Sequence, residues 1–424
     1  MGAKRYALVG TGHRGSGMFA RPLSRDFPAT AELAAVVDAN PLRMAAVVAD
    51  LGLNVPTFTD FDAMMSAVDP DAVVVATRDA THAEYIIGAL KAGKRAISEK
   101  PLCTTAEQCR AILAAAAKSK GRCMVTHNAR YGSAERTMHA IVRSGRLGKI
   151  SFMQFDETLD RCHGADYFRR WHCRKANSGG LLIHKASHHF DILNFLAASK
   201  PARVSAVGAL KFYGRNGPFR HKHCRGCPHA DRCDFYTDFT KREVYKKMYL
   251  DAESADGYFR DGCVFAADID AEDQMAVLIE YQSGLQVSYT LTAYSPYESQ
   301  RVIIEGSDAR LEYHAGMNTG WIVDSKPMPG VEQIARETLR LFDPKTGAED
   351  VPIVRLEGGH GGADPALRAD FFGRDWSEPP NEYMASVEEA VQAVLIGAAA
   401  NESMATGRPV DVQALLNDRE AGRP

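Results

Sequence analysis

The chain has 424 residues, longer than one domain usually is, so two domains and a sizeable core are expected. Its 51 lysines and arginines almost balance its 53 acidic residues, which argues against binding to nucleic acid or to a membrane surface. No apolar run approaches the roughly 20 residues of a membrane-spanning helix, and the N-terminus leads directly into a strand, so a cytoplasmic protein is expected.

The N-terminal segment carries a dinucleotide-binding pattern. A predicted strand at 6–9 is followed by Gly10-x-Gly12-x-x-Gly15, and a second strand at 33–37 ends at Asp38. The glycines allow the backbone to approach a pyrophosphate at a helix N-terminus, and Asp38 would accept hydrogen bonds from the adenosine ribose. A carboxylate there repels a 2′-phosphate, which favours NAD over NADP, although Arg14 and Arg43 could offset that repulsion.

Helices and strands alternate after this pattern, with helices expected at 45–51, 61–68 and 82–92 and strands at 72–76, 95–98 and 122–126. This order predicts a doubly wound parallel sheet. Ligands of such sheets bind beyond the carboxyl ends of the strands, which places residues 77–81 and 99–101 near the nicotinamide. The expected cofactor contacts are Gly10, Gly12, His13, Arg14, Gly15, Asp38, Thr77, His82, Glu99, Lys100 and Asn128.

Residues 179–191 are predicted to form one helix with an ionisable face. At about 100° per residue, Leu182, Ile183, Ala186, Phe190 and Leu193 share one side, while His184, His188 and Asp191 lie opposite and Lys185 lies at the edge. A solvated surface helix would also show two faces. Two histidines and an aspartate, however, can exchange or orient protons near neutral pH, so this helix is the candidate wall of an active site.

Two further segments are candidate substrate contacts. Residues 166–175 combine arginines with aromatics, and Arg169, Arg170 or His172 could hold an anionic or polyhydroxylated ligand, although a run this basic is often only exposed. The glycine-rich loop 358–364 presents His360 close to its backbone, where a ligand could reach it.

An insertion at about 213–268 contains Cys224-x-x-Cys227-x5-Cys233 and then Cys263. These four thiols suggest a structural zinc site, with an iron–sulfur cluster as the less favoured alternative and His223 or His229 as other fourth ligands. Unconnected reduced cysteines are the remaining interpretation. The nine cysteines of the chain are an odd number, which argues against a disulfide framework.

The C-terminal part alternates apolar and polar residues in predicted strands at 150–158, 202–211, 274–281, 285–292, 300–305 and 309–313. Such alternation predicts an antiparallel sheet with one covered face. A helix at 386–406 ends the pattern and could pack back on the first domain. The expected domains are therefore 1–125, which binds the dinucleotide, and 126–424, which holds the substrate.

Six motifs, in this order, resemble the Gfo/Idh/MocA oxidoreductases, the relatives of glucose-fructose oxidoreductase and inositol dehydrogenase. They are Gly10-x-Gly12-x-x-Gly15, Ala76-Thr77 with His82, Ala92-Gly93-Lys94, Glu99-Lys100-Pro101, Asn128-x-Arg130-Tyr131, and Gly179-Gly180 leading to His188-x-x-Asp191. The resemblance implies an N-terminal Rossmann domain, a C-terminal α/β domain with a large open, mainly antiparallel sheet, NAD or NADP, and homodimers or homotetramers formed through that sheet.

The resemblance also implies residue roles. Lys100 matches the lysine that contacts the reacting hydroxyl, His188 matches the acid/base, and Tyr131 and Asp191 fall at substrate positions. The chain departs from the D-x-G-x-H-x-x-D signature, because His184 replaces its first aspartate and Ala186 its glycine. We interpret the H-K-x-x-H-H-x-x-D pattern as a subfamily with altered substrate or chemistry.

The expected function is NAD-dependent oxidation of a hydroxyl of a sugar or sugar derivative, with His188 as base and Lys100 assisting. An alternative is an NAD-dependent glycoside hydrolase or lyase that forms a transient keto-sugar, with His184 and Lys185 providing a second base. A basic pocket of this kind would suit anionic or sulfonated glycosides. A non-catalytic sugar sensor is disfavoured because Lys100 and His188 are both present.

Overall fold

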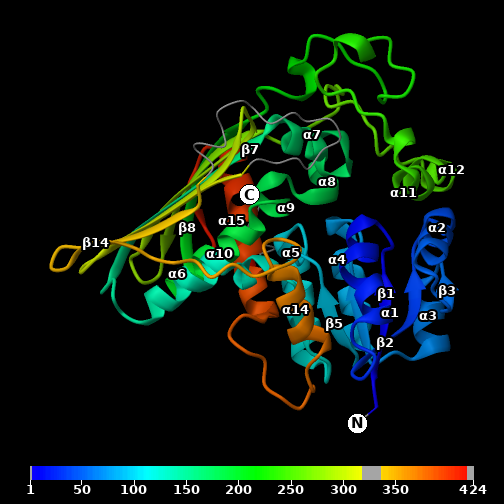
Figure 1. The fold of residues 1–424 in the computed structure, drawn as a ribbon, viewed down its shortest axis with the longest axis horizontal. Helices are drawn as coiled ribbons and strands as arrows, with labels where there is room; N and C mark the ends of the chain where they lie inside the picture. The colour runs from blue at the N-terminus through cyan, green and yellow to red at the C-terminus, as the bar shows by residue number, and fades with distance from the viewer. Residues whose placement is uncertain (1, 318–335, 418–424) are drawn as a thin grey trace.

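The computed structural model describes residues 2–317 and 336–417. Within these residues the chain forms two sheets with helices around them (Figure 1). The first has the strand order β15-β6-β5-β4-β1-β2-β3 and the second the order β14-β13-β12-β11-β7-β10-β9-β8-β16. The predicted fold class, a doubly wound parallel sheet followed by a mainly antiparallel sheet, is confirmed. No helix of the described part is long and apolar enough to cross a membrane.

The first sheet is parallel through six strands: β1 Lys4–Val9, β2 Ala31–Val37, β3 Thr57–Phe58, β4 Ala72–Val75, β5 Arg95–Ser98 and β6 Cys123–Val125. The four residues of β4, Ala-Val-Val-Val, are all buried, as expected of a central strand covered on both faces. The helices around it include α1 Arg21–Arg25, α2 Pro41–Leu51, α3 Phe61–Val68, α4 His82–Lys91 and α5 Ala106–Lys118.

The second sheet contains β7 Ile150–Asp160, β8 Pro201–Ala209, β9 Gln274–Tyr281, β10 Gln286–Ser295, β11 Glu298–Gly306, β12 Arg310–Met317, β13 Thr338–Asp343, β14 Gly347–Asp350 and β16 Val410–Asp411. Strands β7 and β10 pair in parallel and the other neighbours are antiparallel. Along β9 exposed and buried residues alternate strictly, so one face is covered and the other is open. The predicted strands of this region are therefore confirmed, with boundaries shifted by a few residues.

The single helix predicted for 179–191 is wrong. The segment forms α9 Leu181–His184 and α10 Ser187–Ala197, separated by a turn at Lys185 and Ala186. The His184 carbonyl accepts a hydrogen bond from Lys100 Nζ at 2.9 Å, from the loop after β5. In a continuous helix a backbone amide of the same helix would donate to this carbonyl instead.

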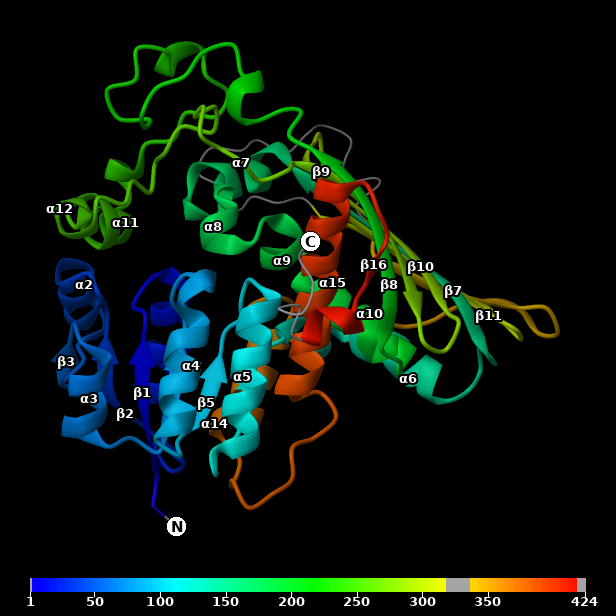
Figure 2. The same cartoon turned by 180° about the vertical axis from the view of Figure 1, so that it is seen from behind.

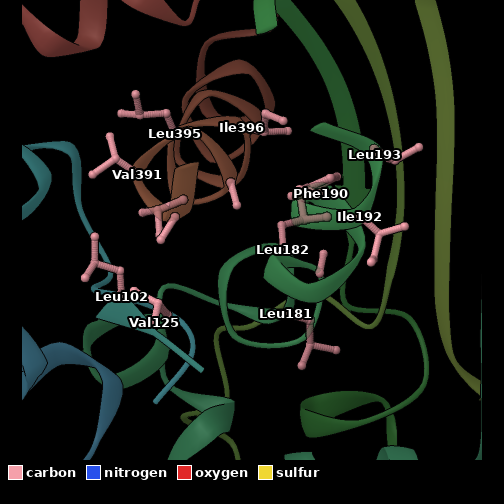
Figure 3. Packing of buried hydrophobic residues seen from close by; sticks show 14 of the residues in the cluster. Leu102, Val125, Leu181, Leu182, Phe190, Ile192, Leu193, Val391, Leu395 and Ile396 are labelled. Carbon is pink, nitrogen blue, oxygen red and sulfur yellow. The ribbon is translucent and has the colours of Figure 1, made fainter. Parts of the chain in front are cut away.

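The apolar residues of α9 and α10 are buried as predicted. Leu182, Phe190 and Leu193 are at most 1% exposed, and their helices contact α15 Val387–Thr406, whose Ile396 points toward the side of Phe190 in Figure 3. Since α15 also contacts α5 and β8, this helix lies between the two sheets and ties the segment bearing His184 and His188 to the first sheet.

The chain returns to the first sheet before α15. Helix α14 Ala363–Phe372 places Phe372 against Tyr6 of β1, with ring centroids 5.3 Å apart, and β15 Ala385–Ser386 pairs with β6. The insertion has only short helices, among them α11 Glu243–Tyr245 and α12 Glu253–Asp256, and it extends from the second sheet to α2 (Figures 1 and 2).

Candidate active site

The glycine loop after β1 has the geometry that a pyrophosphate needs. Gly10 has φ +97°, and a Cβ on Gly15 would lie 1.9 Å from the Gly10 carbonyl oxygen. A Cβ on Gly12 would meet only the Tyr249 hydroxyl, at 3.8 Å, so this side of the loop is where a phosphate could approach the backbone. The observed backbone therefore fits a bound dinucleotide.

Asp38, the residue predicted to bind the adenosine ribose, directly follows β2. Its Oδ2 accepts hydrogen bonds from the Thr11 amide and hydroxyl, each at 2.7 Å, and its Oδ1 accepts from the Asn40 amide at 2.8 Å. The guanidinium of Arg43 lies 3.6 Å from Asp38 but pairs more closely with Asp256, at 2.7 Å. Arg43 is therefore engaged by two carboxylates and is poorly available to a 2′-phosphate.

Lys100 follows β5 at the carboxyl edge of the first sheet. Its Nζ donates to the His184 carbonyl, which leaves further donors of the ammonium group for a ligand. Burial lowers the pKa of Lys100 to about 8, although the carboxylates of Asp79 and Glu99 act in the opposite direction. This lysine can therefore gain or lose a proton near neutral pH.

His184 is oriented by a carboxylate that the sequence did not single out. Its Nδ1 lies 2.5 Å from Asp79 Oδ2, and Asp79 is only 2% exposed at the carboxyl end of β4. Burial raises the pKa of Asp79 and lowers the pKa of His184, so this pair shares a proton without His184 becoming a stable cation. A carboxylate that holds one imidazole nitrogen orients the other for proton transfer.

His188 lies in α10, half-buried beside His127, with the two ring centroids 6.4 Å apart. The Nδ1 atom of His188 and both ring nitrogens of His127 are buried without a hydrogen-bond partner. Burial lowers the pKa of His188 well below its ordinary value, and the charge of Lys100 lowers it further. His188 is thus a neutral imidazole, the protonation state that a proton acceptor needs.

Lys185, in the turn between α9 and α10, and Asp191 of α10 are both held in buried ion pairs. Lys185 Nζ lies 3.1 Å from Glu157 of β7, and although burial opposes its charge, Glu157 raises the pKa of Lys185. Asp191 accepts two hydrogen bonds from Arg130, both at 2.7 Å, and neither side chain is more than 1% exposed. Lys185 as a base and Asp191 as a substrate contact stay predictions, and either role would require a group that is already paired.

The basic aromatic segment divides between two regions. His172 stacks on Trp171, with ring centroids 3.7 Å apart, lies 4.1 Å from the His184 ring and has a buried Nδ1 without a partner. Arg170 pairs with Asp166 at 2.9 Å. Arg169 instead donates to Phe235 O and to Cys224 Sγ, so its guanidinium contacts the insertion, and its predicted substrate contact stays a prediction.

The remaining predicted residues surround the glycine loop. Asp364 receives hydrogen bonds from Asn128 Nδ2 at 2.9 Å and His360 Nδ1 at 2.7 Å, and Arg14 bridges Asp364 and Glu99. His360 is therefore linked through Asp364 to Arg14 of the cofactor loop. His82 contacts the carbonyls of Pro101 and Thr77, which fixes the loops after β4 and β5. The Tyr131 side chain is buried under Tyr383.

The predicted zinc site is not supported. Cys224, Cys227, Cys233 and Cys263 line one small pocket of the insertion, so the sequence did predict their proximity. All four are free thiols, and in the described part of the chain no group of three or more His, Cys, Asp or Glu residues is arranged to hold a metal. The Cys224 Sγ atom instead accepts a hydrogen bond from Arg169.

Two family models match this chain, one over its N-terminal part and one over its C-terminal part. Residues 4–127 match the family model described as "Oxidoreductase family, NAD-binding Rossmann fold", and residues 140–412 match the model of the same family's C-terminal alpha/beta domain. The protein YteT of Bacillus subtilis (strain 168) is 32% identical over 433 residues, which cover 97% of this chain and 99% of YteT. An inositol 2-dehydrogenase of Rhizobium meliloti (strain 1021) is 32% identical over 49% of this chain and 58% of its own length.

A solved levoglucosan dehydrogenase, in complex with NADH and L-sorbose, superposes with a TM-score of 0.68 at 21% identity, covering 97% of this chain and 99% of the other. At that identity the similarity establishes a common fold. The family models together span most of the chain, the first over β1 to β6 and the second over all strands of the second sheet. The chain therefore belongs to the Gfo/Idh/MocA oxidoreductase family, with an NAD-binding Rossmann fold at its N-terminus and the family's C-terminal α/β domain.

Proposed function

We propose that this oxidoreductase oxidises a hydroxyl group of a sugar or sugar derivative, with NAD as the hydride acceptor. The observation that carries the proposal is the convergence of Lys100, His184 and His188 at the carboxyl edge of the first sheet, beside the dinucleotide loop. The inositol 2-dehydrogenase and levoglucosan dehydrogenase among the relatives support a polyhydroxylated substrate. Residues 1–125 would bind the dinucleotide, and residues 126–424 would hold the substrate.

In this proposal His188 accepts the proton of the substrate hydroxyl, because its imidazole is neutral. The Lys100 ammonium donates a hydrogen bond to the same oxygen and so stabilises the developing alkoxide. Bound NAD supplies the acceptor for the hydride of that carbon. His172 and Arg170 lie on the His184 side of this group and are the proposed substrate contacts.

The test is absorbance at the reduced-nicotinamide band while the purified protein, supplied with NAD or NADP, meets a panel of free sugars, inositols and sugar acids. A substrate-dependent rise with NAD is expected, with NADP less effective because Asp38 is present and Arg43 is held by Asp256. If no polyol or sugar produced a rise, the dehydrogenase proposal would fail.

One observation favours a second candidate, an NAD-dependent glycosidase or lyase that forms a keto-sugar only transiently. Such a cycle needs an additional base for the carbon acid, and the His184–Asp79 pair is a second oriented imidazole beside Lys100. Lys185 does not serve here because Glu157 holds it. Release of a chromophore from a glycoside that requires NAD but produces no net NADH would identify this reaction.

The outer face of the second sheet is the proposed subunit contact. Leu278 of β9 and Val207 of β8 are 62% and 70% exposed on open sheet positions, where a second copy could cover them. Light scattering should therefore give a mass at least twice that of the monomer, and a monomeric mass would contradict this proposal.

The pKa of Lys100 leads to a pH prediction. Since burial lowers this pKa to about 8, the ammonium that contacts the substrate oxygen is present below pH 8 and is lost above it. The kcat/KM of the wild type should therefore fall above about pH 8. In Lys100→Arg the guanidinium stays protonated, so the residual activity should lose this alkaline limb. The measurement is kcat/KM from pH 6 to 10 for both proteins; an unchanged limb in Lys100→Arg would assign it to another group.

A further inference from the structure

The far end of the insertion packs on the dinucleotide loop. Residues 239–258, which we call the cofactor strap, place Tyr245 and Tyr249 against the segment between Gly12 and Gly15. The His13 amide donates a hydrogen bond to the Tyr249 hydroxyl at 2.9 Å, and the His13 ring stacks on Tyr245 with centroids 5.7 Å apart. In both views of the fold α11 and α12 of the strap lie beside α2 (Figures 1 and 2).

The strap is also anchored at the ribose end of the same site. Asn40 Nδ2 donates to Ala252 O at 2.9 Å, and Arg43 donates to Met248 O at 3.3 Å and to Asp256 at 2.7 Å. Asn40 and Arg43 lie two and five residues after Asp38, the residue expected to bind the ribose. One short segment of the insertion therefore contacts both the pyrophosphate loop and the ribose-binding turn.

The contact between Tyr249 and His13 bears directly on nucleotide binding. Backbone amides of a glycine loop at a helix N-terminus are the donors that bind a pyrophosphate. The Tyr249 hydroxyl accepts from one of these amides, and it is also the only atom that a Cβ on Gly12 would meet within 4 Å. Tyr249 is only 6% exposed, so its hydroxyl is held at the position where the phosphate oxygens of a dinucleotide would come closest to the loop.

We propose that the cofactor strap is part of the dinucleotide site and retains NAD between turnovers. The Tyr249 hydroxyl, which has its own proton to donate, binds a pyrophosphate oxygen, while the Arg43–Asp256 pair and the Asn40 contact keep the strap closed over the ribose. Release of the cofactor then requires the strap to open. The inference rests on the proposed NAD dependence, and it adds residues of the insertion to a site that the Rossmann domain alone would otherwise form.

The test compares NADH release from the full-length wild type with release from Tyr249→Phe and Asp256→Asn. Tyr249→Phe removes only the hydroxyl, and Asp256→Asn weakens the anchor at Arg43. Both should speed release by about tenfold in stopped-flow fluorescence and weaken NADH binding in calorimetry by a similar factor, the effect of losing one hydrogen bond to a charged group. Tyr236→Phe is the matched control, since Tyr236 is exposed on the same insertion outside the strap, and its release rate should equal the wild-type rate.

Two outcomes would overturn the inference. Unchanged release in both variants would show that the strap does not take part in binding, and tighter binding by Tyr249→Phe would show that the hydroxyl competes with the pyrophosphate for the His13 amide. Thermal unfolding of each variant establishes that the compared proteins are folded. If the wild type bound neither NADH nor NAD, the proposed function itself would fail, which calorimetry on the wild type reveals before any variant is made.

Discussion

Replacing His188 with asparagine is expected to lower kcat by about 10³-fold while leaving the affinity for NAD unchanged. General-base catalysis typically contributes 10²–10⁴-fold, and asparagine keeps the approximate size of the side chain but cannot accept a proton as imidazole does. Burial and the neighbouring Lys100 keep His188 neutral, so the wild type does not need to lose a proton before each reaction. The measurements are steady-state turnover and calorimetric binding of NAD.

The adjacent histidine provides a matched control. His189 lies on the same helix, but its Nδ1 bonds with the Tyr289 hydroxyl at 2.9 Å and its ring stacks on Phe155. His189→Asn should therefore lower thermal stability and leave turnover of the folded protein near the wild-type value. If His188→Asn kept more than a tenth of the turnover and His184→Asn lost it, the base would be the His184–Asp79 pair.

Asp191→Ala is expected to destabilise the protein by about 3–5 kcal/mol, the usual cost of leaving one member of a buried ion pair without its partner. Asp191 accepts both hydrogen bonds of the Arg130 fork, and the two side chains are completely or almost completely buried. Burial opposes the charge on Arg130, but Asp191 offsets this effect and raises the pKa of Arg130. The variant would therefore enclose a guanidinium that has lost its main partner. The measurement is denaturant-induced unfolding, together with the melting temperature.

Glu389→Gln is the control for this prediction. Glu389 also pairs with Arg130, at 3.0 Å, but its side chain is 45% exposed, so its loss should cost about 1 kcal/mol or less. Equal effects of the two substitutions would contradict the structural role given to Asp191. A fully stable Asp191→Ala that had lost affinity for its sugar would support the sequence-based prediction of a substrate contact.

The sequence predicted the parts of the protein that depend on neighbouring residues. Glycine spacing, the following helix and Asp38 at the end of the second strand are all encoded within residues 6–38, and the structure places them as the pattern indicates. Strands of the second sheet were predictable because alternation along one strand reflects burial on one face only. The proximity of the four insertion cysteines was also predicted, although three of them lie within ten residues and their spacing alone did not determine whether they bind a metal.

The pairing of charged side chains was decided only by the tertiary structure. Asp79 and His184 are separated by 105 residues, Arg130 and Asp191 by 61, and His13 and Tyr249 by 236. A helical wheel placed His184, His188 and Asp191 on one face as if they shared one role. In the structure a turn follows His184, whose carbonyl accepts a hydrogen bond from Lys100. Each of the three residues therefore meets a different environment. The sequence by itself therefore determined the family and the dinucleotide loop, and it named the candidate reactive groups. Their roles were set by tertiary packing, because the protonation and accessibility of a buried group depend on which distant side chains the fold brings into contact with it.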